Sequence, residues 1–207
     1  MNTLYVRYCT TAVLLSCLSL GAQAQTADPK FEAMLKEGFR AQGIAGLDRL
    51  EQDRIQALCS DPELRQTPAA QKVLIEEQSK AMAAIQPPAD GKYLGSWKAG
   101  EAVAQSGRGA TWSDTTKTPN GGGCYNCHQI NKQEISYGNI GPSLTGYGKT
   151  RGTSDAILTY TWNRISNSKA YNACSNMPRM AHFNLLTEQQ IKDVMALLLD
   201  PESPVNK

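Results

Sequence analysis

Cys124, Cys127 and His128 form a Cys-x-x-Cys-His motif that brings two thiols and an imidazole together in one short stretch. Thiols at this spacing can add to the two vinyl groups on one edge of a porphyrin, and the adjacent imidazole can then bind its iron. Because the chain contains only 6 Cys and 2 His, a chance match is improbable. The motif therefore predicts covalent attachment of one haem c through Cys124 and Cys127, with His128 as an iron ligand.

Two other kinds of site use a Cys-x-x-Cys pair. A thioredoxin-like redox pair lies beside alternating strands and helices, and no such alternation surrounds residues 124–128. A structural zinc ion needs a second ligand pair at similar spacing, whereas Cys59, Cys174 and His182 are far apart in the sequence. Both interpretations are therefore weaker than haem attachment.

The N-terminus has the pattern of an export signal. Arg7 precedes an apolar run over residues 10–21, and Ala22-Gln23-Ala24 then matches a small-residue cleavage site. This order predicts a signal peptide over residues 1–24 that is removed after Ala24, which places the mature chain, beginning at Gln25, in the periplasm.

A lipoprotein signal is the alternative for the same segment. Leu14-Leu15-Ser16 precede Cys17, which would then be the lipid-bearing residue. The apolar run continues past Cys17 and a better cleavage site follows, so removal after Ala24 is favoured.

No later run approaches the roughly 20 apolar residues that a membrane-spanning helix needs, so we expect no membrane span.

Export also decides what the remaining cysteines can do. Loss of the leader leaves Cys59 and Cys174 outside the motif, and an oxidising compartment allows them to form a disulfide. That bond would pin the N-terminal segment to the haem domain; two buried free thiols are the alternative.

The formal net charge of +2 argues against nucleic acid or an anionic membrane as the main partner.

Residues 25–90 are predicted to form a helical N-terminal extension. Thr67-Pro68 caps and begins one helix, which Pro87-Pro88 ends. Apolar residues at positions 47, 50, 55 and 58 predict an imperfect surface helix before it. Because the extension is too small for a core of its own, its apolar faces should dock on the following domain or on a partner subunit.

Residues 91–207 are predicted to be a second, all-helical domain. Helices are expected around residues 97–105, from Thr153 or Ser154 to about residue 165, and over residues 187–199. Gly100 in the first of these would let another helix approach closely. Thr187 and Gln190 form a capping box for the last helix, which should cross the first and close the haem pocket.

The loop over residues 140–144 follows the attachment motif and should lie on the histidine side of the haem. The carbonyl of Pro142 is a plausible acceptor for the Nδ1 proton of His128, which would turn Nε2 toward the iron. A simple turn without this contact is the alternative.

The sixth iron ligand should come from residues 173–180. Met177 is favoured because Pro178 would stiffen the loop and direct the thioether at the iron, where a soft neutral ligand raises the reduction potential. Met180 and His182 are the rival ligands. If none of the three binds, the haem would be five-coordinate and open to ligand binding or peroxidase chemistry.

The order of these features over residues 91–200 resembles a class I cytochrome c. Three stretches resemble the SoxX family, the monohaem subunits of SoxAX cytochromes; they are residues 137–144, residues 173–179, and residues 186–194 running into 198–206. The extension over residues 25–90 is the part least like the family. The resemblance implies a class I cytochrome c fold to which this extension is added.

The resemblance also implies a role in sulfur oxidation. The chain would form a heterodimer with SoxA, which carries the catalytic haem and joins thiosulfate to a cysteine of the carrier protein SoxYZ. The SoxX haem would receive the electrons and pass them to a small cytochrome c, so no catalytic residue is expected here. A free periplasmic electron carrier, or a haem enzyme or sensor with an exchangeable sixth ligand, are the alternatives.

Overall fold

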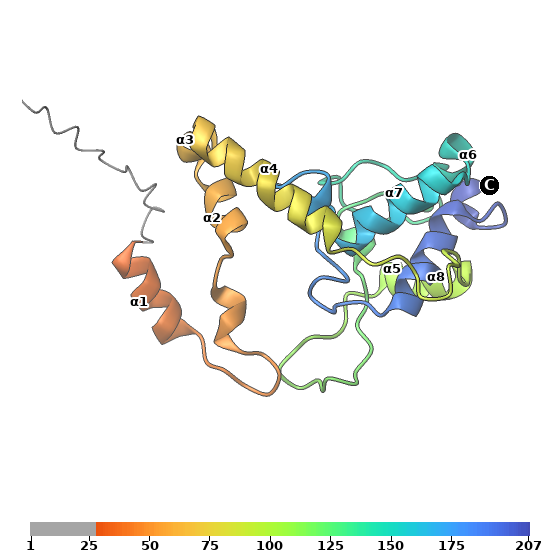
Figure 1. Ribbon diagram of the computed structural model, residues 1–207. Helices are drawn as coiled ribbons and strands as arrows, with labels where there is room; N and C mark the ends of the chain where they lie inside the picture. Colours follow the sequence, from red (N-terminus) through yellow and green to blue (C-terminus); the bar gives the residue numbers. More distant parts are fainter. Residues whose placement is uncertain (1–27) are drawn as a thin grey trace, which may run out of the picture.

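The computed structural model describes residues 28–207, and the regular elements in this range are all helices (Figure 1). Gln42 and Ala45 form an isolated β-bridge, and no strand occurs in the described range. The predicted all-α class is therefore confirmed. Ala24 and Cys17, the two candidate processing sites of the leader, lie outside the described residues.

The N-terminal extension consists of short helices joined by acidic and Thr caps. Asp28, Asp53, Asp61 and Thr67 each accept a hydrogen bond from a backbone amide of the helix that follows. The elements are α1 (Pro29–Gly38), η1 (Leu47–Leu50), α2 (Arg54–Ser60), α3 (Pro62–Arg65) and α4 (Pro68–Ala83).

The helix expected through positions 47–58 is interrupted in the structure. Asp53 forms a capping box with Gln56, so a new helix begins at Arg54 and the preceding apolar positions form only the 3-10 turn η1. The cap overrides the apolar spacing because it satisfies backbone amides that a continuous helix would have bonded internally.

The C-terminal half carries the helices that surround the candidate site. They are α5 (Trp97–Gln105), η2 (Cys124–Asn126), α6 (Tyr147–Arg151), α7 (Asp155–Ser166), η3 (Ser168–Ala170), α8 (Glu188–Leu199) and η4 (Pro204–Asn206). The predicted capping box of α8 is confirmed, since Thr187 and Gln190 each accept a hydrogen bond from the other's backbone amide. Ser154 stands at the N-cap of α7, but its side chain makes no capping bond.

Helices α5 and α8 cross in direct backbone contact. Gly100 is buried on α5, and a Cβ atom built there would fall on the carbonyl oxygen of Asp193 in α8. The Asp193 carboxylate also accepts a hydrogen bond from the Ser96 amide at 2.8 Å. The close approach predicted from Gly100 is therefore confirmed, and it places the two helices as one unit.

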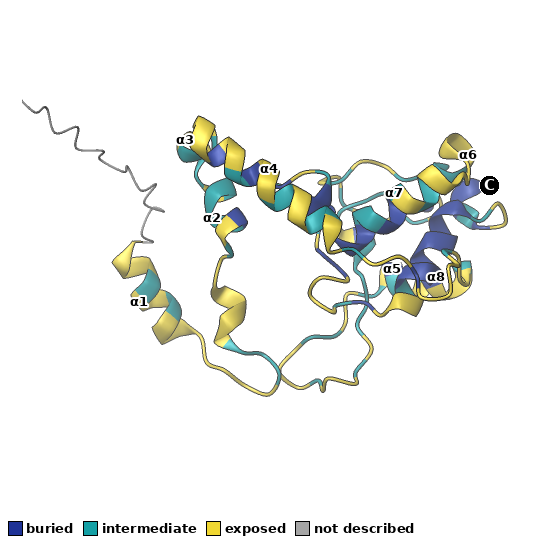
Figure 2. Cartoon of the chain, viewed as in Figure 1, coloured by how far each residue is buried: buried dark blue, intermediate teal, exposed yellow. Residues whose placement is uncertain are grey.

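The core is built around α8, every residue of which is buried from Ile191 to Leu199 (Figure 2). Trp162 and Ile165 of α7 and Ala104 of α5 pack into the same cluster. Leu158 of α7 is only half-buried. None of the helices between residues 28 and 207 combines the length and hydropathy needed to cross a bilayer.

Part of the extension docks on the C-terminal half of the chain and part does not. Ile55 and Leu74 form a small cluster with Ala173, and the Trp162 indole donates to the carbonyl of Gln86 at 2.8 Å. By contrast, α1 buries none of its residues and lies away from the rest of the chain in Figure 1. Docking within the chain therefore accounts for α2 to α4 but not for α1.

Replacement of Gly100 by Ala should destabilise the fold. Alanine is favoured over glycine inside a helix by about 1 kcal/mol, so any loss must come from the collision with the Asp193 carbonyl. We expect a loss of about 2 kcal/mol in the free energy of unfolding, measured by urea denaturation followed by circular dichroism. Gly107→Ala is the control because its added Cβ meets no atom closer than 3.7 Å; equal stability of both variants would contradict the prediction.

Candidate functional site

The attachment motif forms a single tight turn. Residues Cys124–Asn126 make the 3-10 turn η2, and the amides of Cys127 and His128 both donate to the carbonyl of Cys124, at 3.1 and 2.9 Å. Tyr125 is buried beneath this turn, and its hydroxyl accepts a hydrogen bond from the Asn131 amide at 3.2 Å. The turn therefore presents both thiols and the imidazole from one rigid segment.

Cys124 and Cys127 are not bonded to each other in the structure. Both are half-buried, and burial raises the pKa of the Cys124 thiol to about 11, so this thiol is neutral at neutral pH. Within residues 28–207, no three His, Cys, Asp or Glu side chains gather as they would around a zinc ion. Two free thiols with no cluster of further metal ligands among the described residues fit addition to a porphyrin better than metal binding.

His128 is oriented by the loop that follows the motif. Its Nδ1 atom lies 2.7 Å from the carbonyl oxygen of Pro142, which can only accept, so Nδ1 carries the proton and Nε2 is left to bind iron. Gly141 makes this approach possible because a Cβ there would fall on the imidazole ring. The Gly141 amide also donates to the carbonyl of Cys127 at 2.8 Å, which ties the loop to the motif.

The three candidate sixth ligands differ in their surroundings. Met180 is buried in the main core, and His182 is exposed with its ring against Phe183. Met177 is half-buried beside the core, on a loop whose backbone is fixed by a 2.6 Å hydrogen bond from the Ser168 hydroxyl to the Met177 carbonyl. Of the two methionines, Met177 thus has the freer side chain on an ordered backbone.

A side chain that sequence reasoning did not single out links the two sides of the site. Asn120, in the loop before the motif, donates to the carbonyl of Leu185 at 3.0 Å, while its own carbonyl accepts from Gln190 of α8 at 2.6 Å. It joins the cysteine-bearing segment to the methionine-bearing segment. A lone Asn in a Gly- and Thr-rich stretch gives no sequence signal for such a contact.

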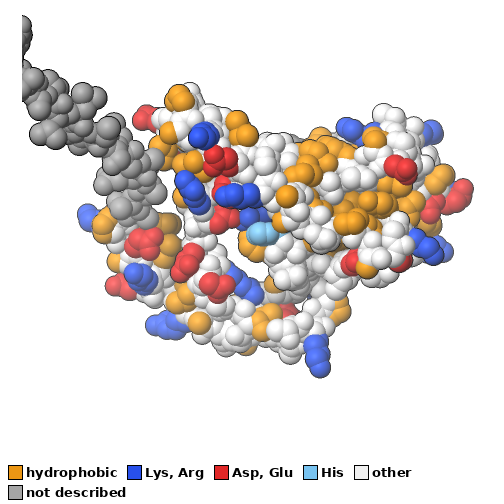
Figure 3. All heavy atoms as spheres, viewed as in Figure 1, with side chains coloured by type: hydrophobic (Ala, Val, Ile, Leu, Met, Phe, Trp, Pro, Cys, Tyr) orange, Lys and Arg blue, Asp and Glu red, His pale blue; other side chains and the backbone are white. Residues whose placement is uncertain are grey.

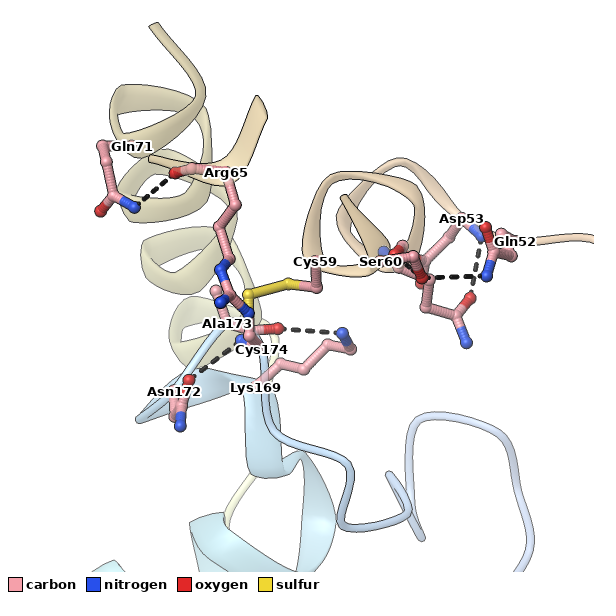
Figure 4. The surroundings of a disulfide bond; sticks show 11 residues. Gln52, Asp53, Cys59, Ser60, Arg65, Gln71, Lys169, Asn172, Ala173 and Cys174 are labelled. Atoms are coloured by element: carbon pink, nitrogen blue, oxygen red, sulfur yellow. Dashed lines mark hydrogen bonds between the residues drawn. A yellow bond between two sulfur atoms is a disulfide. The ribbon is translucent and has the colours of Figure 1, made fainter. Parts of the chain in front are cut away.

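Cys59 of α2 and Cys174 are joined by a disulfide, with their Cα atoms 5.4 Å apart (Figure 4). Cys174 precedes Met177 by three residues, so the bond lies close to the candidate ligand. The same view shows Lys169, whose Nζ donates to the Ala173 carbonyl at 2.9 Å. Burial lowers the pKa of Lys169.

The donor set fits a covalently bound haem. Two thiols stand on a tight turn, an imidazole has its Nδ1 engaged, and the thioether of Met177 lies on a separate loop. When bound at such a site, haem c supplies a one-electron carrier. An all-α fold with this attachment turn defines the c-type cytochromes.

Comparison with known proteins agrees with this class. Residues 99–200 match the cytochrome c family. A protein of Aquifex aeolicus (strain VF5), described only as an uncharacterized lipoprotein, is 38% identical over 189 residues, which cover 90% of this chain and 84% of the relative. The chain therefore contains a cytochrome c domain over residues 99–200, and this family implies a covalently bound haem c.

The mass of the exported protein should exceed that of its polypeptide by one haem. We expect Cys124→Ala and Cys127→Ala each to leave a single thioether bond, visible as a shifted pyridine haemochrome band, and the double variant to retain no covalent haem. A Cys59→Ala/Cys174→Ala variant is the control, and should keep both thioether bonds. An exported wild-type protein without added haem mass would refute the assignment.

Proposed function

We propose that this chain is the electron-transfer subunit of a thiosulfate-oxidising cytochrome complex of the SoxAX type. It binds one haem c through Cys124 and Cys127, with His128 and Met177 as the axial ligands. The observation that carries the proposal is the arrangement of the SoxX-like stretches, because residues 137–144 contain the loop that orients His128 and residues 173–179 contain Met177 and the disulfide.

Binding of the haem iron by His128 on one side and Met177 on the other would limit this chain to electron transfer. An imidazole and a thioether leave no open position for substrate, and the soft sulfur favours the reduced iron and raises its potential. Formation of the bond between thiosulfate and the SoxYZ cysteine therefore belongs to the partner, SoxA. This chain contributes no catalytic residue; it accepts the released electrons and passes them to a small cytochrome c.

A complex is favoured over a free carrier by the surface of the extension. Phe31 and Met34 of α1 are 49% and 57% exposed and lie one helical turn apart, and no core among residues 28–207 covers them. In Figure 3 the extension carries both basic and acidic side chains, while hydrophobic side chains gather over part of the C-terminal half. An apolar face with no strong net charge suits a stable protein partner.

Periplasmic location is part of the proposal. Removal of residues 1–24 leaves a mature chain that begins at Gln25. The name of the Aquifex aeolicus relative favours the other candidate, lipid attachment at Cys17. The mass of the mature protein distinguishes cleavage after Ala24 from lipid attachment at Cys17. Lipid attachment would give a chain that begins eight residues earlier and carries acyl chains.

Met177→Leu should abolish the far-red absorption band that ferric haem shows when a methionine sulfur is bound. Leucine keeps the volume of the side chain but has no sulfur. Met180→Leu is the matched control, and we expect it to keep the band because Met180 belongs to the core. A band that survives Met177→Leu and disappears in Met180→Leu would transfer the ligand role to Met180.

Thiosulfate should reduce this haem only in the presence of its partners. With SoxA and SoxYZ present, we expect reduction of the haem bound at Cys124 and Cys127, followed by rapid oxidation when a small cytochrome c is added. Optical spectra of stopped-flow mixtures measure both steps, and mixtures without SoxYZ are the control. Turnover of the SoxA haem while this haem stays oxidised would refute the relay. Rapid binding of carbon monoxide by the wild-type ferrous protein would instead favour a haem enzyme or sensor.

A further inference from the structure

The loop around Met177 is held on one side by its own domain. The Ser168 hydroxyl donates to the Met177 carbonyl at 2.6 Å, and Lys169 donates to the Ala173 carbonyl at 2.9 Å. Both bonds end on the backbone of the loop. They restrain the path of the chain but make no contact with the side chains that flank Met177.

The N-terminal extension holds the same loop through side chains on either side of Met177. Before it, Cys174 is covalently joined to Cys59 of α2, across 115 residues of sequence. After it, Arg179 Nη2 lies 2.6 Å from the Oδ2 atom of Asp53, the N-cap residue of α2. Helix α2 and its N-cap residue are therefore bonded to the loop on both sides of Met177.

The ion pair is better shielded than a surface pair. The Arg179 side chain is only 6% exposed, and its guanidinium lies 4.3 Å from the centre of the Phe183 ring. Burial raises the pKa of Asp53, but hydrogen bonds from the Gln56 amide and from Arg179 lower it more, so its pKa stays below the ordinary value. The carboxylate is thus charged at neutral pH, and loss of it would leave a buried guanidinium unpaired.

The loop needs such restraint because there is space beside it. A cavity of about 500 Å³ lies between the extension and the loop, lined by Gln56 and Arg65 on one side and by Met177 and Pro178 on the other. Close-packed surroundings would hold a side chain without special bonds. Cys59, Cys174 and Arg179 line the same cavity, so the disulfide and the ion pair border the space beside Met177.

We propose that α2 is a clamp whose Asp53–Arg179 ion pair and Cys59–Cys174 disulfide position the Met177 sulfur for iron binding. The inference rests on the proposed ligation by Met177. The four clamp residues are positioning residues, since none of them touches the iron. The clamp gives the N-terminal extension a role in setting the reduction potential of the site.

The test compares two clamp variants of the full-length, haem-loaded protein. Asp53→Asn removes the charge but keeps an Oδ1 atom that can still cap α2, so it breaks the ion pair and spares the helix. Cys59→Ala/Cys174→Ala removes the disulfide without leaving a lone thiol. Glu77→Gln is the matched control, because it replaces a carboxylate of α4 that pairs with Lys80 at the same 2.6 Å. Met177→Leu is the reference for loss of the ligand.

We expect both clamp variants to fold and bind haem but to weaken the far-red band and lower the reduction potential. Carbon monoxide should bind their ferrous forms about tenfold faster than wild type, since the population with Met177 displaced rises by that factor. Combination of the two changes should have a larger effect than either. Glu77→Gln should match wild type in all three measurements. These readouts report ligation, which loss of stability alone would not change in a folded protein.

Two results would overturn the clamp, and they can be told apart. If Met177→Leu abolishes the band while both clamp variants keep the wild-type band, potential and carbon monoxide rate, the clamp is wrong and the proposed ligation stands. If Met177→Leu keeps the band, the ligand assignment itself fails and the clamp fails with it. If the disulfide variant does not fold, Asp53→Asn alone decides, because its helix cap is preserved.

Discussion

The backbone contact between α5 and α8 is the constraint on which the site depends. At Gly100 the two helices meet without an intervening side chain, and the loops of the site are attached to this crossing. The Gly122 amide donates to the carbonyl of Val103 in α5 at 2.8 Å, and Gln190 of α8 donates to the carbonyl of Asn120 at 2.6 Å. The cysteine turn is thus fixed to both helices at once, and a shift of either helix would move it.

Both candidate axial ligands lie on irregular segments, so each needs partners that a helix would have supplied. The Pro142 carbonyl fixes the ring of His128, and the Ser168 hydroxyl fixes the carbonyl of Met177. Asn120 then joins the two sides through Leu185. An electron carrier benefits from this arrangement because its ligands should stay in place when the iron changes charge, and no residue has to move for the transfer.

Features that depend on residues close together in the sequence could be predicted, whereas features that depend on residues far apart could not. Helices α4 and α8 were predictable because Thr67-Pro68 and the capping box of Thr187 act within one turn. The interruption of the helix expected through positions 47–58 was not predicted, since the Asp53 cap competes locally with an apolar pattern. The bond between Asp53 and Arg179 spans 126 residues, and no local pattern marks such a pair.

The extension divides into an inner and an outer part that differ in how they contact the rest of the chain. Its inner part, from Asp53 to Leu74, is fixed to the methionine-side loop by covalent, ionic and apolar contacts. Its outer part, α1, has no buried residue and is linked to the inner part by an irregular segment and the turn η1. Between the two parts, Arg49 of η1 donates to the carbonyl of Ala110, in the loop before the cysteine motif. The extension therefore contacts the loops on both sides of the site, through η1 on the cysteine side and through α2 on the methionine side.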